Sequence, residues 1–381
     1  MPHVSSIIIY PVKSAQGLPV TKANITDFGF EHDRRWAIVS RMKMKSDADH
    51  ENMNNDWRVE NQWASHRRLA SIVTNIEEGE SGSLTLVLSA PGVKQHLRVP
   101  IRSVADPKRR ITVRDVQRTT LPFAEDEGNE AAAWLTSYLA LDRHLDTKFR
   151  LAWCPPDAKR WLSKDPRYGS LMAAEDCTAF ADTAQFHLTS VSSLAALTRD
   201  MRRVTSNYEG TIAMDCFRPN IVVDGFPEYA EDHWHMIEFE RGVVLRVCMP
   251  DLRCSVIDNE QSGARAGSRG TAFQMLREIK NLRPAVLRGG AVFGVKLNLL
   301  RKVVSSSTTT TLSSVSVGDA CVIKKCTKSS LLELDLAGLR AELLPELSSK
   351  ENLYALIKPV HVVVSFALAL AVAAGVSKIN L

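Results

Sequence analysis

The chain lacks the features that mark a zinc protein, a disulfide-stabilised protein or a nucleic-acid-binding protein. Its seven cysteines are odd in number and form no CxxC pair, so neither a zinc site nor a disulfide framework is expected and a reducing compartment is favoured. The net charge of +5 comes from basic residues spread along the chain, without the concentrated basic face that nucleic acid requires. Cations placed singly beside polar turns fit a small anionic ligand better.

A targeting segment is also missing from the N-terminus. The opening, "MPHVSSIIIYPVKS", enters a strand-like apolar run at once and leaves no room for a signal or transit peptide. With 381 residues, of which 45% are hydrophobic and 24% charged, the chain can bury a sizeable core. We expect two domains, or one large domain with appendages.

Periodicity predicts a mixed α+β fold that is rich in β-strands. Alternating runs predict an N-terminal β-barrel-like domain over residues 1–125 and a second β-barrel domain over 150–325. Two short strands are predicted around Gly29, the second containing Trp36–Val39. The other predicted strands are 4–10, 83–90, 96–101, 220–225, 236–250, 291–304 and 314–324. The predicted helices are 128–142 and 190–201, and the runs 41–57 and 305–311 read as polar loops.

The composition changes after Lys325. Residues 326–358 form an amphipathic linker, predicted to be helical up to Pro345, and 359–381 form a hydrophobic tail. Val360–Val376 carries no charge and reaches the short limit of a bilayer span. A buried C-terminal helix would explain this run. A tail anchor explains it better, because the segment is apolar on every face, whereas a helix docked on one side need not be. We therefore expect a membrane-bound protein with cytosolic catalytic domains.

Four polar clusters interrupt the β pattern. They are "YPVKSAQG" with Lys13 and Ser14, "HDRRW" with Arg34, "CFRPNIVVDG" with Arg218 and Asn220, and "RC" with Arg253 and Cys254. Cations and neutral donors of these kinds suit a phosphate or a pterin. Taken singly, each cluster has an ordinary explanation as a solvated turn, a surface charge pair or turn chemistry. Their joint order is what carries weight.

In that joint order the chain resembles the MOSC superfamily, the molybdenum-cofactor sulfurase C-terminal domain proteins. The matching pieces, in order, are "SIIIYPVKS", "DRRWAIV", "FADTAQFHLTSVSSLAAL", "FRPNIVVDG", "YAEDHW", "LRCSV", "FGV" and "VSVGDACVI". The resemblance is strongest to the branch of amidoxime-reducing components and N-hydroxylated-base reductases. It covers residues 5–324 and leaves out the tail.

The resemblance implies a molybdenum cofactor held between two β-rich domains. The Arg-Cys cysteine of the family, here Cys254, would supply a thiolate to molybdenum, which suits a soft ligand. The implied cofactor contacts are Lys13, Ser14, Arg34, Thr183, Arg218, Asn220 and Arg253. The cations would neutralise the cofactor phosphate, and Arg253 would help to keep Cys254 ionised. At superfamily level the resemblance also carries an association with pyridoxal phosphate.

The chain departs from the family pattern near Cys254 and at its end. Asp251 stands where the family often has a second cysteine, so Cys254 is expected to act alone, with Asp251 adding local negative charge. The run after Cys254 is one residue shorter than usual. The tail lacks the cysteine spacing of an iron–sulfur domain, so electrons would come from another protein. In eukaryotic relatives the donors are a b-type cytochrome and an NADH-dependent reductase.

Three functions remain open from the sequence. The first is a molybdenum-dependent oxidoreductase that reduces N-hydroxylated substrates such as amidoximes and hydroxylamines. The second is a sulfur-carrier or cofactor-handling protein with a persulfide on Cys254. The third is a binding protein that has kept the pocket without turnover. A tail anchor would place the protein on an intracellular membrane, the mitochondrial outer membrane or the endoplasmic reticulum.

Overall fold

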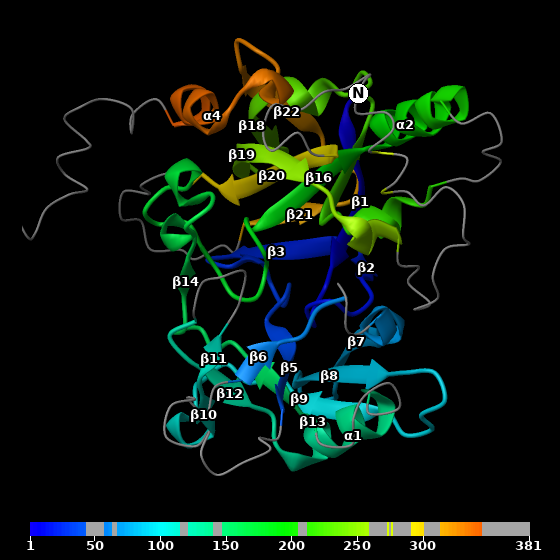
Figure 1. Cartoon of the computed structure of the whole chain (residues 1–381), viewed down its shortest axis with the longest axis vertical. Helices are drawn as coiled ribbons and strands as arrows, with labels where there is room; N and C mark the ends of the chain where they lie inside the picture. The colour runs from blue at the N-terminus through cyan, green and yellow to red at the C-terminus, as the bar shows by residue number, and fades with distance from the viewer. Residues whose placement is uncertain are drawn as a thin grey trace, which may run out of the picture.

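The structure, a computed structural model, describes residues 1–42, 57–62, 67–114, 121–139, 147–204, 212–258, 273, 276, 291–300 and 313–344. Most of the loop predicted at 41–57, the polar run at 305–311 and the whole tail at 359–381 lie outside these residues, as does most of the run after Cys254. Within the described part, the secondary structure is dominated by strands (Figure 1).

The first part of the chain holds most of the shorter strands. They are β1 (His3–Ile9), β2 (Leu18–Val20), β3 (Lys22–Thr26), β4 (Gly29–Phe30), β5 (Trp36–Met42), β6 (Trp57–Val59), β7 (Val73–Glu78), β8 (Leu84–Ser89), β9 (Leu97–Pro100), β10 (Arg110–Ile111), β11 (Val113–Arg114), β12 (Ala124–Asp126) and β13 (Thr147–Trp153). Helix α1 (Asn129–Leu139) lies between β12 and β13.

The remaining strands lie in the second part of the chain. They are β14 (Arg160–Trp161), β15 (Cys177–Thr178), β16 (Phe186–Ser190), β17 (Ile221–Asp224), β18 (Trp234–Phe239), β19 (Val244–Leu252), β20 (Val292–Leu299), β21 (Ser314–Ser316) and β22 (Cys321–Cys326). Helix α2 (Val191–Val204) follows β16, and α4 (Leu336–Leu343) follows β22.

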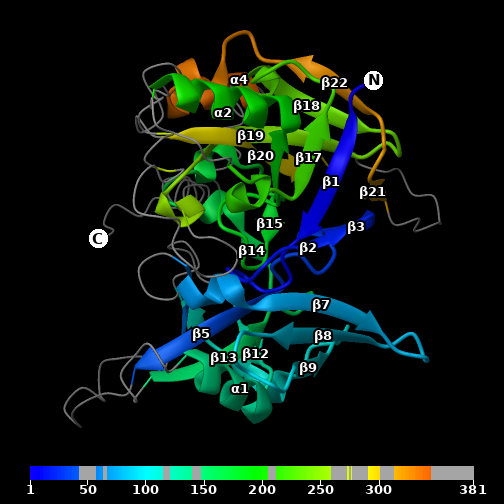
Figure 2. The same ribbon diagram turned by 90° about the vertical axis from the view of Figure 1, so that its right-hand side faces the viewer.

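An eight-stranded sheet in the order β2-β1-β17-β16-β20-β19-β18-β22 forms the larger core. Its N-terminal strand β1 pairs antiparallel with β17 (Figure 2). The start of β1 also meets the segment before β22, because Val4 N donates to Asp319 O at 2.9 Å and Cys321 N donates to Pro2 O at 3.0 Å. The sheet is therefore nearly closed on itself, which confirms the predicted barrel character.

A six-stranded sheet in the order β10-β12-β13-β5-β6-β11 forms the lower part of the molecule in Figure 1, together with the three-stranded sheet β7-β8-β9. Helix α1 packs its buried face, which includes Trp134 and Leu135, into the same core as β5, β8 and β9. Because β1 belongs to the upper sheet and β5 to the lower one, the chain between Ile9 and Trp36 links the two parts. The predicted β-rich architecture with two β units is confirmed.

Two predicted strands are each divided into two by a tight turn at a glycine. The run 236–250 forms a hairpin, β18 and β19, that reverses near Gly242 with φ +77°. The run 314–324 is divided at Gly318 with φ +92°, and β21 then pairs with β3 while β22 pairs with β18. Glycine is suited to both turns because its lack of a Cβ permits a left-handed backbone.

The chain after β22 begins as predicted, with helical structure. The Asp335 side chain caps α4 by accepting a hydrogen bond from Gly338 N, and Leu339 and Leu343 are buried against the larger core. Among the described residues, no helix has both the length and the hydropathy needed to cross a membrane. The predicted anchor lies outside them.

Candidate functional site

The predicted site residues lie at the ends of strands in the eight-stranded sheet and beside β5. Strand β1 runs antiparallel to β17, and β17 runs parallel to β16. The segment after β1 therefore lies at the same end of the sheet as the segments before β16 and β17. Lys13 and Ser14 follow β1, Thr183 precedes β16, Arg218 and Asn220 precede β17, Arg34 precedes β5, and Arg253 and Cys254 follow β19.

Lys13 is buried and holds the loop before β16. Its ammonium donates to Phe180 O at 2.9 Å and forms an ion pair with Asp182. Its backbone N–H donates to Trp36 O at 2.8 Å. Burial lowers the pKa of Lys13, and Asp182 partly restores it. Burial alone would raise the pKa of Asp182, yet Lys13, Lys296 and Arg34 hold it below its usual range. Asp182 is therefore ionised at neutral pH and faces the Lys13 ammonium.

Arg34 and Asn220 are in direct contact. Arg34 Nη1 donates to Asn220 Oδ1 at 3.0 Å and also pairs with Asp33. The Asn220 amide in turn donates to Ile8 O at 3.1 Å and accepts from His187 N at 3.2 Å. Asn220 is only 1% exposed. It therefore joins β1, β16 and the segment before β5 at one point.

Arg218 and Arg253 connect the remaining segments. Arg218 adopts a left-handed backbone with φ +56°, and its guanidinium lies over the Tyr10 ring at 4.3 Å from the centroid. Arg253 Nη2 donates to Phe217 O at 2.7 Å, the carbonyl directly before Arg218. Burial lowers the pKa of Arg218 to about 10, so it remains cationic at neutral pH. The segment that carries Cys254 is thus tied to the segment that carries Arg218.

Cys254 is exposed, but its thiol is not activated by its neighbours. Desolvation of the thiol raises the pKa of Cys254, Arg253 lowers it, and Asp182 and Asp251 raise it. The net direction is upward. Arg253 therefore acts in the expected direction, but desolvation and the two carboxylates outweigh that guanidinium and the backbone N–H of Val256. The thiolate needs a further positive charge, such as a metal ion, to form near neutral pH.

Ser14 and Thr183 are at the edge of the group. Ser14 follows Lys13 with a left-handed backbone, φ +69°, and its carbonyl accepts a hydrogen bond from Gln62 Nε2. Thr183 follows Asp182 and is half-buried. Within the described part of the chain, neither hydroxyl is paired with another protein group. Both hydroxyls are therefore available to a ligand.

Several residues of the site were not found from the sequence. Arg160 is 1% exposed and donates to the carbonyls of Ala179, Ala181 and Asp182, so it shapes the loop before β16. Tyr10 lies beneath both Arg34 and Arg218. Asp182, the partner of Lys13, was also missed. The sequence "FADTAQ" held a signal for it, because a carboxylate next to the predicted contact Thr183 is a candidate partner for a cation of the site.

Asp251 is buried at the centre of a second set of contacts. Its Oδ2 lies 3.1 Å from His187 Nε2 and 3.3 Å from Lys296 Nζ, and it pairs with Arg253. Burial alone would raise the pKa of Asp251, but Arg253, Lys296 and His187 lower it. Burial lowers the pKa of His187 to about 3, so His187 is neutral. Asp251 thereby fixes the position of Arg253, next to Cys254.

This arrangement fits a molybdenum cofactor. The Nε of Arg253 is buried and has no protein partner in the described residues, so it is available to a ligand beside Cys254. Lys13, Arg34 and Arg218 supply positive charge for a phosphate, and Asn220 orients Arg34. The described residues contain no cluster of three or more His, Cys, Asp and Glu side chains able to hold a metal ion. A single thiolate beside cations suits a metal that brings most of its ligands with it.

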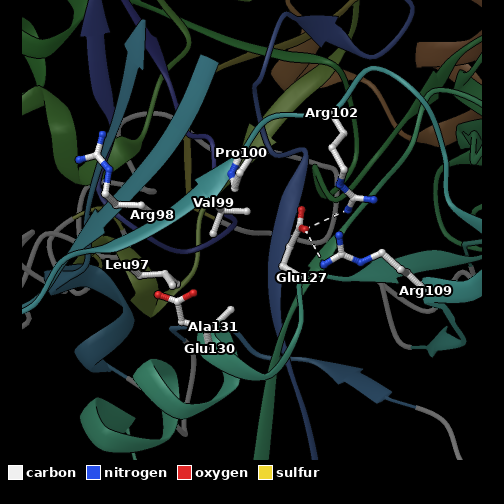
Figure 3. A pocket seen from close by; sticks show the side chains of 9 residues that line it. All are labelled: Leu97, Arg98, Val99, Pro100, Arg102, Arg109, Glu127, Glu130 and Ala131. Atoms are coloured by element: carbon white, nitrogen blue, oxygen red, sulfur yellow. Dashed lines mark hydrogen bonds and ion pairs between the residues drawn. The ribbon is translucent and has the colours of Figure 1, made fainter. Parts of the chain in front are cut away.

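A pocket of about 180 Å³ lies elsewhere, in the lower part of the molecule (Figure 3). Its lining residues are Leu97, Arg98, Val99, Pro100, Arg102, Arg109, Glu127, Glu130 and Ala131. Arg102 and Arg109 both point toward Glu127, at 2.9 and 3.5 Å, and Arg98 pairs with Glu77. Because none of the predicted site residues lines this pocket, it is not the candidate site.

Comparisons with known proteins match two domain models and several relatives. The MOSC N-terminal beta barrel domain matches residues 1–142, and the MOSC domain matches residues 176–322. Mitochondrial amidoxime-reducing component 1 of Homo sapiens is 29% identical over 290 residues, 74% of this chain and 73% of that protein. Mitochondrial amidoxime reducing component 2 of Rattus norvegicus is 28% identical over 61% of this chain and 59% of its own length.

Two further matches are more distant. Molybdenum cofactor sulfurase of Arabidopsis thaliana is 23% identical over 62% of this chain, but the alignment spans only 26% of that protein. A crystal structure of YiiM from Geobacillus stearothermophilus covers 45% of this chain and 69% of its own, with 12% identity and a TM-score of 0.25, too low to support an argument. None of these relatives supports the association with pyridoxal phosphate. The two matched domains, in this order and over most of the described chain, show that the protein belongs to the MOSC-domain family.

Proposed function

We propose that this protein is a molybdenum-cofactor-dependent oxidoreductase that reduces N-hydroxylated compounds, such as amidoximes and hydroxylamines, with electrons from a separate protein. The proposal is carried by the contacts between segments: Arg34 bonds Asn220, and Arg253, next to Cys254, bonds the carbonyl before Arg218. Asp182, the partner of Lys13, is near enough to Cys254 to raise its pKa. The printed names of the amidoxime-reducing relatives supply the reaction class.

The residues have separate roles in this proposal. Lys13, Arg34 and Arg218 bind the anionic end of the cofactor, and Asn220 holds Arg34 in place. Ser14 and Thr183 donate from the edge, and the free Nε of Arg253 donates beside the metal. Cys254 would hold the metal through Sγ and would lose its proton there, since desolvation raises the pKa of the free thiol. When bound, the cofactor supplies the two-electron chemistry that removes oxygen from nitrogen.

The test is cofactor analysis of the purified full-length protein, followed by reduction of benzamidoxime with a chemical electron donor. We expect one molybdenum and one pterin per protein chain, and we expect the protein to reduce benzamidoxime. The Cys254→Ser variant is expected to lose turnover and keep its fold, because a hydroxyl is a poor substitute for a soft thiolate. Cys326→Ser is the matched control, since Cys326 is also exposed but lies on β22. Full activity in Cys254→Ser contradicts the assignment of the ligand.

A sulfur-carrier or cofactor-handling role is the second candidate. It is favoured by the exposure of Cys254 and by the similarity to molybdenum cofactor sulfurases. A carrier would bear a persulfide on Cys254 and contain no molybdenum after purification. Mass spectrometry of the peptide that contains Cys254, together with the metal content, separates the two proposals.

The proposed electron donors are a b-type cytochrome and an NADH-dependent reductase.

We propose that residues 359–381 anchor the protein to an intracellular membrane, the mitochondrial outer membrane or the endoplasmic reticulum, with the catalytic domains in the cytosol. A span of 17 residues, Val360–Val376, reaches roughly 25 Å as a helix, and Lys358 and Lys378 can extend to the interfaces. Fractionation of the full-length protein against one ending at Lys358 tests this. Full-length protein that alkaline carbonate strips from membranes would contradict it.

A further inference from the structure

Tyr10 is the central contact of two arginines in the proposed cofactor site. It follows β1 directly and is 1% exposed. The Arg34 guanidinium carbon lies 4.6 Å from the centroid of the Tyr10 ring, and that of Arg218 lies 4.3 Å from it. Both distances are within the range of a cation–π interaction, which gains strength when the groups are shielded from water. One buried ring therefore contacts both cations.

The ring itself is fixed by contacts on several sides. The Tyr10 hydroxyl donates to Pro219 O at 3.1 Å, directly after Arg218. The backbone N–H of Tyr10 donates to Asp33 Oδ1 at 2.7 Å, and Tyr10 O accepts from Arg34 N at 2.7 Å. A Cβ added at Gly17 would lie 2.7 Å from Tyr10 Cε1, so the ring packs closely on that backbone. Tyr10 is thus bonded to both segments that carry the arginines.

Both arginines also have an unusual backbone. Arg34 has φ +48° and Arg218 has φ +56°, a left-handed conformation that is strained for a residue other than glycine. Strain of this kind is kept where the surrounding structure enforces it, which is common at functional sites. The Tyr10 contacts are part of that surrounding structure. Burial raises the pKa of Tyr10 to about 12 despite the two arginines, so the ring stays neutral and its π face remains available.

We propose that Tyr10 is a positioning residue, whose ring holds the Arg34 and Arg218 guanidiniums at a fixed spacing to receive one phosphate group. The inference rests on the proposed function, since the phosphate is that of the cofactor. Two guanidiniums repel each other when they are buried together, and a neutral π system between their segments offsets part of that repulsion. A phosphate then meets two forked donors already in place, which reduces the ordering cost of binding.

The test uses inorganic phosphate as the probe and the full-length protein purified without cofactor. Binding is measured by calorimetry for the wild type, Tyr10→Phe, Tyr10→Leu and the control Tyr138→Leu. Tyr138 is a matched control because it is buried, lies 5.8 Å from the Arg68 guanidinium and donates its hydroxyl to Arg68 O, but belongs to the lower core.

We expect Tyr10→Phe to bind phosphate within about threefold of wild type, and Tyr10→Leu to bind on the order of tenfold or more weakly. Tyr138→Leu should bind like wild type. If Tyr10→Leu does not fold, Tyr10→Met takes its place with the same expectation, because methionine also removes the π face and keeps most of the side-chain volume.

Three outcomes would overturn the proposal. They are wild-type affinity in folded Tyr10→Leu, loss of binding in Tyr10→Phe, and absence of phosphate binding in the wild type. The proposed function is tested separately, since molybdenum content and benzamidoxime turnover in the wild type do not depend on the result for Tyr10.

Discussion

At the scale of single residues, the cations of the site are largely matched by carboxylates of the chain itself. Lys13 pairs with Asp182, Arg34 with Asp33 and Arg253 with Asp251. Such pairing lets several cations be buried together, since an uncompensated buried charge is strongly disfavoured. An anionic ligand therefore meets a set of donors whose positions are already fixed.

Arg218 offers a direct test of phosphate contact. We predict that Arg218→Ala weakens cofactor retention by roughly 10- to 150-fold, the equivalent of about 1.5–3 kcal/mol for a charge-assisted hydrogen bond. Alanine tolerates the left-handed backbone about as poorly as arginine does, so the melting temperature of the cofactor-free protein should change little. Arg35→Ala is the control, because Arg35 stacks on Phe28 at 4.2 Å, away from the group. Equal molybdenum retention in both variants would mean that Arg218 has only a structural role in its turn and does not contact the phosphate.

His187 gives the protein a predicted dependence of stability on pH. Burial lowers its pKa to about 3 in the folded state, against about 6.5 when unfolded. Between these values the unfolded chain binds a proton that the folded chain does not, so stability falls as pH decreases from 6.5 toward 3. The slope from this residue is at most about 1.4 kcal/mol per pH unit.

The matched variant is His187→Gln, which keeps a donor for Asp251 but cannot titrate. We expect its free energy of unfolding, measured by denaturant titration between pH 4 and pH 7, to vary less steeply than that of wild type. Parallel curves for the two proteins would show that His187 does not titrate in this range.

At the scale of elements, the approach of β20 to β16 depends on Gly294. Its φ is +76°, and an added Cβ would lie 2.4 Å from Leu188 O and 2.7 Å from His187 Nε2. Gly318 has a similar φ of +92°, but nothing lies within 4 Å of its Cβ position. The two glycines therefore share backbone strain and differ in steric room.

We predict that Gly294→Ala destabilises the protein by about 1–3 kcal/mol more than Gly318→Ala, because only the former overpacks the core. Unfolding midpoints in urea measure the difference. If the two substitutions lower the free energy of unfolding equally, the strain of a positive φ explains both losses. The close approach of β20 to His187 would then not be the reason that glycine is required at position 294.

Local pattern was sufficient for several elements, and the fold brings two of the predicted site residues, Arg34 and Asn220, into direct contact. Helix α1 was predicted at 128–142 and lies at Asn129–Leu139, and β1 was predicted at 4–10 and lies at His3–Ile9. Helix α1 has apolar residues at helical spacing, and β1 ends in a run of three isoleucines shortly before Pro11. The hairpin of β18 and β19 was missed because apolar residues flank the turn at Gly242 on both sides.

The roles of Tyr10 and Asp251 could not be predicted, because their partners are distant in sequence. The hydroxyl of Tyr10 bonds a carbonyl 209 positions away. Asp251 was seen only as the replacement of a cysteine, whereas the fold surrounds it with His187, Arg253 and Lys296. Burial of this kind depends on strand order, which local pattern does not contain.

At the scale of the whole molecule, the site depends on the course of the chain between its two parts. Strand β1 completes the eight-stranded sheet, and the next residues, from Tyr10 to Arg34, lead to β5 in the lower sheet. Lys13 and Arg34 thus come from the N-terminal part, while Arg218, Asn220 and Cys254 come from the second. A ligand held by both sets would link the two parts and stabilise them together.

The most direct test of the central claim is X-ray absorption at the molybdenum edge, on the wild-type protein and on Cys254→Ser loaded with cofactor. The account predicts one sulfur neighbour fewer around molybdenum in the variant, because it assigns the Cys254 thiolate as the single protein ligand of the metal. An unchanged number of sulfur neighbours in the two spectra would contradict it.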